Sequence, residues 1–179
     1  MNISKRKLTK LINIFGGPGI GKSTVIAGLF HLMKINQIEV EIAHEFAKDL
    51  VWDNQTDILK TDQLYVFAHQ YRRIYRLMNK VEYIIVDCPL LMHIPYIADG
   101  FLVGLEPLIV ESHHTFNNQS FLLNRRPDHK YVTEGRHNTE EESFRIHDEL
   151  VDILNKYNEP YTEVVVSPDA PKTILSLLS

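Results

Sequence analysis

The stretch GGPGIGKST occupies residues 16–24, between a mostly apolar run at 11–15 and a helical pattern of apolar residues from 25 to 33. Its spacing, G-x-x-x-x-G-K-S, is that of a phosphate-binding P-loop, and a strand before it with a helix after it is the context that this motif requires. Glycines let backbone N–H groups turn toward a phosphate chain, and the helix amino terminus adds partial positive charge. The sequence therefore predicts a phosphate cradle.

The residues of this cradle have different expected roles. The Lys22 ammonium is expected to reach the β and γ phosphates of a bound nucleotide, and the Ser23 hydroxyl is expected to ligate Mg²⁺. A glycine-rich turn that only joins a strand to a helix is the alternative, which the match in both motif and flanks disfavours. The predicted nucleotide-binding residues are Gly16, Gly17, Pro18, Gly19, Ile20, Gly21, Lys22, Ser23 and Thr24.

Length and composition narrow the class of protein. A chain of 179 residues suits one domain, over residues 1–179, with a well-buried core. With 19 basic against 23 acidic residues the net charge is -4, which lacks the strong positive field of a dedicated nucleic-acid binder but leaves room for a local basic groove. The single cysteine, Cys88, cannot form an internal disulfide, and no apolar run is long enough for a membrane span. We therefore expect a soluble cytoplasmic protein.

Strand-like runs alternate with helical patterns, which indicates an α/β domain with a mostly parallel sheet. Strands are expected at 10–15, 39–43, 83–86, 120–123 and 162–166. Helices are expected at 22–35, 61–80 and 171–178, and one more begins at 138 or 139, where Thr139 and Glu142 have the spacing of a capping box. Residues 90–118 look helical, but Pro95, Gly100 and Pro107 interrupt them, so two or three helices are expected there.

Asp87 directly follows the apolar run at 83–86. Parallel sheets bind ligands at the carboxyl ends of their strands, so Asp87 is expected to face the site and to hold the Mg²⁺ shell through a water. The alternative role is an N-cap for the segment that begins near Pro89. Cys88 is expected to be a small buried side chain and not a nucleophile.

Two groups of basic residues suggest contacts with anions. Residues 124–138, NRRPDHKYVTEGRHN, are expected to form a basic lid in which Arg125, Arg126 and Arg136 close over the γ phosphate, unless they are only a solvated loop. The other group lies on the polar face of the helix at 61–80 and is either a solvated face or the wall of an anionic substrate site. Its members are Arg72, Arg73 and Arg76.

Four segments together carry a family resemblance: GGPGIGKST, HEFAK at 44–48, IIVDCPLL at 84–91 and YVTEGRHNTEEE at 131–142. In these the chain resembles P-loop kinases of the nucleoside and nucleotide kinase group. The nearest resemblance is to the family of the ribosylnicotinamide kinase domain of the bifunctional NAD-biosynthesis regulator, and small proteins of large DNA bacteriophages are similar. The resemblance covers nearly all of the chain. It implies a three-layer P-loop nucleoside triphosphate hydrolase fold, with five parallel strands in the order 2-3-1-4-5 and a basic lid.

The resemblance also implies roles for single residues. Glu45 matches the acidic residue that faces the γ phosphate and contacts the substrate hydroxyl, and Asp87 matches the strand-end acid, so either is a candidate base. Arg136 is the first choice for the lid cation, with Arg126 beside it. Lys48 stands where the family often has arginine, and lysine cannot make the same bidentate contact.

These residues predict an ATP-dependent, Mg²⁺-requiring phosphotransferase that moves the γ-phosphate of ATP to a nucleoside, a nucleotide or a related hydroxyl acceptor. One alternative is a kinase acting on a hydroxylated base in phage DNA, and another is an ATPase that works as a conformational switch. Four aromatic residues either stack on a base or belong to the core: Phe46, Trp52, Tyr65 and Phe67. The sequence leaves open the acceptor, the choice between ATP and GTP, and the oligomeric state.

Overall fold

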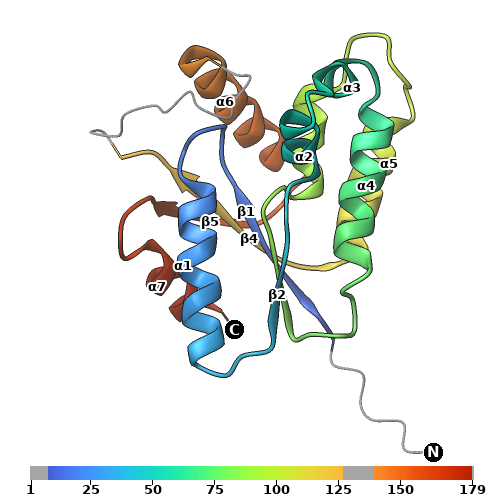
Figure 1. Ribbon diagram of the computed structural model, residues 1–179. Coiled ribbons are helices and arrows are strands. Elements are labelled where there is room, and N and C mark those ends of the chain that lie inside the picture. Colours follow the sequence, from blue (N-terminus) through green and yellow to red (C-terminus); the bar gives the residue numbers. More distant parts are fainter. Residues whose placement is uncertain (1–7, 127–138, 179) are drawn as a thin grey trace, which may run out of the picture.

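The computed structural model describes residues 8–126 and 139–178 and shows a parallel five-stranded sheet in the order β2-β3-β1-β4-β5 (Figure 1). This confirms the predicted order, and helices cover both faces, as expected of three layers. The family of folds is that of P-loop nucleoside triphosphate hydrolases. The strands are β1 (Lys10–Phe15), β2 (Val40–Ala43), β3 (Tyr83–Val86), β4 (Asn117–Asn124) and β5 (Tyr161–Val165).

β1 and β3 are mostly apolar, and β4 is apolar at residues 121–123, because both faces of the sheet are covered there. β1 pairs with β3 on one side, where Ile12 lies opposite Ile85, and with β4 on the other, where Ile14 lies opposite Phe121. All four of these side chains are fully buried. Since every strand runs in the same direction, their carboxyl ends meet at one edge of the sheet, which is where the P-loop leaves β1.

Helices α1 (Lys22–Ile35) and α7 (Ala170–Leu177) cover one face of the sheet (Figure 1). They pack through an apolar cluster in which Leu29 and Ile174 meet Ile12 of β1. The two helices approach each other closely at Gly28, where an added Cβ would lie 2.7 Å from Cγ of Pro171. Gly28 therefore permits this helix contact.

We predict that Gly28→Ala lowers the free energy of unfolding by about 1–2 kcal/mol, because the Pro171 ring is rigid and overpacking outweighs the gain in helix propensity of about 1 kcal/mol. Chemical denaturation measures the change. In a Pro171→Ala background, which removes the obstacle, the same substitution should become neutral or stabilising. An equal loss in both backgrounds would show that the helix contact is not the cause.

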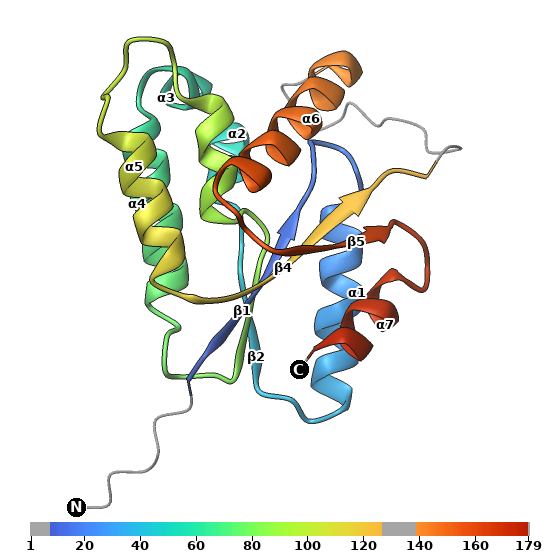
Figure 2. The same ribbon diagram turned by 180° about the vertical axis from the view of Figure 1, so that it is seen from behind.

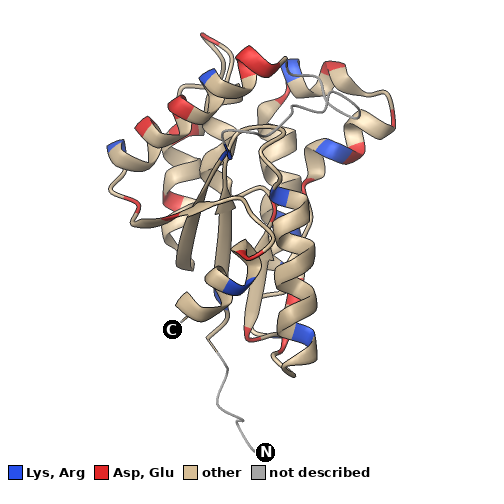
Figure 3. Ribbon diagram, turned by 90° about the vertical axis from the view of Figure 1, so that its left-hand side faces the viewer, with Lys and Arg blue, Asp and Glu red and all other residues tan. Residues whose placement is uncertain are grey.

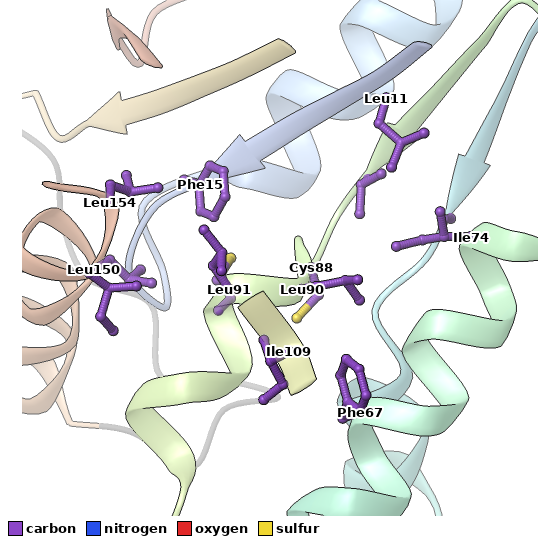
Figure 4. Close-up of a cluster of buried hydrophobic side chains, with 14 of the residues drawn as sticks. Leu11, Phe15, Phe67, Ile74, Cys88, Leu90, Leu91, Ile109, Leu150 and Leu154 are labelled. Atoms are coloured by element: carbon purple, nitrogen blue, oxygen red, sulfur yellow. The ribbon is translucent and has the colours of Figure 1, made fainter. Parts of the chain in front are cut away.

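The other face is covered by α4 (Gln63–Tyr75), the 3₁₀ helix η1 (Leu90–Tyr96), α5 (Leu105–His114) and α6 (Glu140–Lys156), seen from behind in Figure 2. Their side chains meet those of β1 in the larger of the apolar clusters (Figure 4). Phe15 of β1 lies there with Leu91 of η1, Ile109 of α5 and Leu150 of α6, while Phe67 of α4 lies with Cys88. Cys88 is thus a buried core residue, as predicted.

The helix expected at 61–80 begins as predicted but ends earlier. α4 begins at Gln63 because the Asp62 side chain accepts a hydrogen bond from the amide of Tyr65, and it ends at Tyr75. Beyond it the chain turns at Asn79, which has φ of 62° and whose amide donates to the Thr9 hydroxyl over 2.8 Å. Two short helices before it were not predicted, α2 (Phe46–Trp52) and α3 (Thr56–Thr61).

Two other boundaries show how tertiary contacts decide local structure. The helical pattern expected to reach residue 118 stops at His114, because the chain from Asn117 onward pairs with β1 as the start of β4. By contrast, the capping box at the start of α6 is confirmed, since the Thr139 hydroxyl accepts from the amide of Glu142 and the Glu142 carboxylate accepts from the amide of Thr139. Figure 3 shows acidic residues along this helix.

None of the helices in residues 8–126 and 139–178 is both long and apolar enough to span a membrane.

Candidate active site

The loop between β1 and α1 has a backbone that depends on its glycines. Gly19 has φ of 80° and Gly21 has φ of 107°, conformations that side chains rarely tolerate. Gly21 is also the N-cap residue of α1, and no side chain caps this helix. The first amides of α1 therefore face the loop without a side-chain acceptor, which is the arrangement that binds phosphate at a helix amino terminus.

Lys22 holds a positive charge directly at this loop. Its Nζ donates to the carbonyl of Gly16 over 2.7 Å and to that of Gly17 over 3.2 Å. The ammonium is thus folded back along the cradle, where it can exchange these neutral acceptors for phosphate oxygens, which bind an ammonium more strongly.

Two side chains of helix α6 form hydrogen bonds with the backbone of the P-loop, a contact that the sequence did not predict. The Ser143 hydroxyl donates to the Pro18 carbonyl, and the Gly17 amide donates to Nδ1 of His147 over 3.5 Å. Burial is the largest cause that lowers the pKa of His147, and this favours the neutral imidazole that can accept a hydrogen bond. A Cβ on Gly17 would lie 2.6 Å from the Ser143 carbonyl oxygen, so the contact also requires glycine.

A cavity of about 560 Å³ opens in front of the P-loop. It extends from Lys22 and Ser23, past Glu45 and Asp87, to an apolar part walled by α2, α3, α4 and η1. Ser23, Glu45 and Asp87 also line a smaller neighbouring hollow of about 330 Å³. Besides Lys22, Ser23, Glu45 and Asp87, the larger cavity is lined by Pro18, Gly19, Gly21, Thr24, Ala47, Lys48, Val51, Trp52, Thr56, Leu59, Lys60, Gln63, Val66, Cys88, Met92, His93, Tyr96 and Glu142.

Glu45 follows β2 at the N-cap position of α2. Its pKa is raised, chiefly because burial disfavours the charged carboxylate; the Lys22 ammonium lowers it in part, and the Asp87 carboxylate raises it further. These effects show that Lys22, Glu45 and Asp87 share one electrostatic environment. A carboxylate with a raised pKa is a stronger base than an ordinary glutamate.

Asp87 lies directly after β3 and is 7% exposed. Its amide donates to the Ala43 carbonyl over 3.1 Å, which holds it at the carboxyl edge of the sheet. The N-cap of the following helix η1 is Pro89, and no side chain caps that helix. Asp87 therefore does not serve as its N-cap, and its carboxylate lies on the cavity wall instead.

Arg73 of α4 holds the turn that carries Glu45. Its Nη1 donates to the carbonyls of His44 and Glu45, both over 3.3 Å, and its Nη2 pairs with Asp49 of α2. The guanidinium also lies over the Phe46 ring, 5.1 Å from its centroid. Of the three arginines predicted to form this polar face, Arg73 therefore contacts the protein, while Arg72 and Arg76, the C-cap residue that follows α4, are exposed.

The predicted lid is only partly within the described residues. Arg125 pairs with Glu140 over 3.0 Å and donates to the Ser143 hydroxyl over 3.0 Å, so it contacts the start of α6. Arg126 is exposed. Among the described residues, no arginine lines either cavity. Arg136 lies outside the described residues, and the roles of Arg126 and Arg136 stay predictions.

Two histidines, His93 and His113, are buried, and each has a polar neighbour. His113 of α5 lies 3.1 Å from the Glu159 carboxylate, which accepts from the Ser120 hydroxyl over 2.6 Å. His93 of η1 lies 3.8 Å from Sγ of Cys88, and burial lowers its pKa to about 4. His113 thus belongs to a buried polar contact between elements, whereas His93 is a neutral imidazole on the cavity wall.

The strand order, the loop between β1 and α1 and the acidic residue at the end of β3 define a P-loop protein of the nucleoside triphosphate hydrolase class. Within this class the chain belongs to the AAA domain family, which matches residues 11–169. No curated protein matches the chain.

Solved structures share this fold at low sequence identity. NadR protein in complex with NR has a TM-score of 0.69 and 15% identity, covering 96% of this chain and 51% of that one. NadR in complex with NAD and AMP-PNP has a TM-score of 0.72 and 16% identity, covering 96% of this chain and 49% of that one. This chain thus spans about half the length of NadR. Deoxyadenosine kinase from M. mycoides with bound dATP has a TM-score of 0.51 and 16% identity, covering 93% and 97% of the two chains.

Proposed function

We propose that this protein is a kinase that transfers the γ-phosphate of ATP to a hydroxyl group of a nucleoside- or nucleotide-like acceptor. The observation that carries the proposal is that the larger cavity is continuous from the P-loop to an apolar part beyond Glu45 and Asp87. A nucleotide bound at the P-loop would place its terminal phosphate between Lys22 and these carboxylates. The apolar part then has room for a second molecule, which hydrolysis of ATP by water would not require.

The residues that line the larger cavity can have different roles in such a phosphate transfer. Lys22 would neutralise charge on the transferred phosphoryl group, and Glu45 would accept or orient the proton of the attacking hydroxyl. Asp87 is the alternative base. Because the pKa of Glu45 is raised, we assign the base to Glu45 and leave Asp87 as an oxygen ligand for the metal.

The residues present fit a magnesium ion. The Ser23 hydroxyl and the Asp87 carboxylate both line the cavity at the start of α1 and the end of β3. Mg²⁺ prefers such oxygen donors and completes its shell with phosphate oxygens and water. When bound, the ion would neutralise phosphate charge, and Ser23 and Asp87 are the residues that would hold it.

Acceptor-dependent formation of ADP tests the proposal. ADP is measured with ATP and Mg²⁺, first alone and then with nucleosides, nicotinamide riboside, nucleoside monophosphates and DNA containing hydroxylated bases. We expect one class of acceptor to raise the rate at least about tenfold. A rate that is appreciable without any acceptor and unchanged by all of them would contradict a kinase and support the ATPase alternative.

We predict that Arg73→Lys lowers kcat about tenfold with little change in the KM for ATP. Lysine cannot donate to two carbonyls and a carboxylate in one plane, so the turn carrying Glu45 would lose its position. Steady-state kinetics measures both constants. Arg72→Lys, at the exposed neighbouring position, is the control and should leave both unchanged. An equal effect of the two substitutions would rule out this positioning role.

A further inference from the structure

The P-loop is a segment whose backbone has to be held in place by other parts of the protein. Gly19 and Gly21 both have positive φ, of 80° and 107°. Glycine loses more conformational freedom on ordering than any other residue. If a bound nucleotide alone ordered this loop, the loss of freedom would weaken binding. Contacts that order the loop before phosphate arrives therefore raise its affinity for nucleotide.

Two side chains one turn apart on α6, Ser143 and His147, supply such contacts. The Ser143 hydroxyl, which is fully buried, donates to the Pro18 carbonyl, and Nδ1 of His147 accepts from the Gly17 amide over 3.5 Å. Within the described residues, neither side chain lines either cavity. Their effect on a nucleotide in the larger cavity must therefore pass through the backbone of the loop.

Arg125, just after β4, fixes the direction of the Ser143 hydroxyl. Its Nη2 donates to Oγ of Ser143 over 3.0 Å, and its Nη1 pairs with Glu140 over 3.0 Å. The guanidinium also lies 4.3 Å from the centroid of the Phe144 ring. Because a guanidinium can only donate, Oγ of Ser143 is the acceptor in this contact. The hydroxyl proton is thereby left for the Pro18 carbonyl, and the end of β4 is linked through α6 to the P-loop.

The packing of α6 against the loop is closest at Gly17. An added Cβ there would lie 2.6 Å from the Ser143 carbonyl oxygen and 3.2 Å from Cβ of His147. The loop therefore has no room to move toward α6. The two hydrogen bonds from Gly17 and Pro18 oppose movement in the other direction, so α6 restricts the loop on both sides of its position.

We infer that Ser143 and His147 are positioning residues that hold the P-loop in the conformation that receives phosphate and thereby raise the affinity of the protein for ATP. They act through the backbone of Gly17 and Pro18, not by contact with the nucleotide. This inference rests on the part of the proposed function that places ATP at the P-loop. It does not depend on the acceptor.

Calorimetric titration of the full chain with ATP and Mg²⁺ tests the inference. Ser143→Ala removes the hydroxyl, and His147→Leu replaces the imidazole with a side chain of similar size that has no acceptor. We expect each substitution to raise the Kd for ATP at least about fivefold, an effect typical of one lost hydrogen bond. Thermal unfolding is measured for every variant, so that a loss of affinity can be compared with a loss of stability.

Two matched variants separate positioning from a general loss of stability. His147→Asn keeps an acceptor, because Oδ1 of asparagine can take the place of Nδ1, and it should bind ATP within about twofold of the wild type. Ser120→Ala removes another buried hydroxyl, one that donates to Glu159 over 2.6 Å and accepts from Asn13 over 3.3 Å. Since Ser120 lines neither cavity of the described residues, its loss should lower the unfolding temperature and leave the Kd unchanged.

The outcomes separate this inference from the proposed function. Wild-type affinity in Ser143→Ala or in His147→Leu would overturn the role of that residue, and the kinase would stand. The inference is also wrong if Ser120→Ala weakens binding as much as Ser143→Ala, or if His147→Asn weakens it as much as His147→Leu. A wild type that does not bind ATP would overturn the inference together with the nucleotide site. Failure of the kinase alone is seen separately, as ADP formation that no acceptor increases.

Discussion

Lys22→Ala is expected to lower kcat by about 100- to 1000-fold while the protein stays folded. The Nζ of Lys22 is held at the P-loop by the carbonyls of Gly16 and Gly17. It therefore lies at the cradle before phosphate arrives, where phosphate oxygens can replace these carbonyls as its acceptors. Losing one such preorganised charge typically costs this much in rate. Measurement of kcat and KM separates transition-state stabilisation from ground-state binding. We expect the fall in kcat to be larger than the change in the KM for ATP.

The control for this variant lies on the same helix. Lys34, in the last turn of α1, pairs with Glu41 over 3.1 Å, and Lys34→Ala should leave kcat unchanged. Thermal unfolding should show that both variants fold. If Lys22→Ala keeps kcat near that of the wild type, the assignment of residues 16–24 as the catalytic phosphate site is wrong.

Glu45→Gln is expected to lower kcat by about 100- to 10,000-fold, the range for loss of a general base. The wild type should lose activity as the pH falls through the pKa of Glu45, because the protonated carboxyl cannot accept a proton. Burial raises that pKa, so the loss should begin at a higher pH than an ordinary glutamate would give. The residual activity of Glu45→Gln should not show this decline. If the variant keeps the same acid limb, Glu45 is not the base, and Asp87 would be tested next.

Glu45→Gln should lower activity without lowering the stability of the fold. A carboxyl whose pKa is raised on folding binds its proton more readily in the folded state, so its stabilising effect is lost as the pH rises through the folded pKa. At neutral pH the charged Glu45 therefore opposes folding. Glu45→Gln should unfold at a temperature no lower than the wild type. Glu41→Gln, at an exposed position of β2, is the control and should affect neither activity nor stability.

The parts of the fold that the sequence predicted are those with strong local signals. The apolar run of β1, the glycines after it and the helical periodicity of α1 follow each other within residues 10–35, and the structure has them there. α2 and α3 were missed because each is at most seven residues long and packs through only a few apolar side chains. Phe46 and Leu50 are buried against Val66 of α4, a contact that spacing along the chain does not show.

The candidate site was predictable where its residues follow a motif or a strand. Lys22, Ser23 and Asp87 were predicted in that way and line one cavity. By contrast, nothing along the sequence indicates that Arg73 holds the turn that carries Glu45. Ser143 and His147 could have been found, because they share the face of α6 that carries Leu150 and Leu154. Polar residues within an apolar face indicate a buried partner, which here is the P-loop.

The most direct test of the account is the fate of the γ-phosphate. ATP labelled with ³²P at that position is incubated with the protein, Mg²⁺ and the acceptor panel, and label in each acceptor, free phosphate and ADP are counted together. The account predicts that label in one acceptor equals the ADP formed and that both disappear in Lys22→Ala. ADP matched by free phosphate, with no labelled acceptor, would contradict the account and make the protein an ATPase.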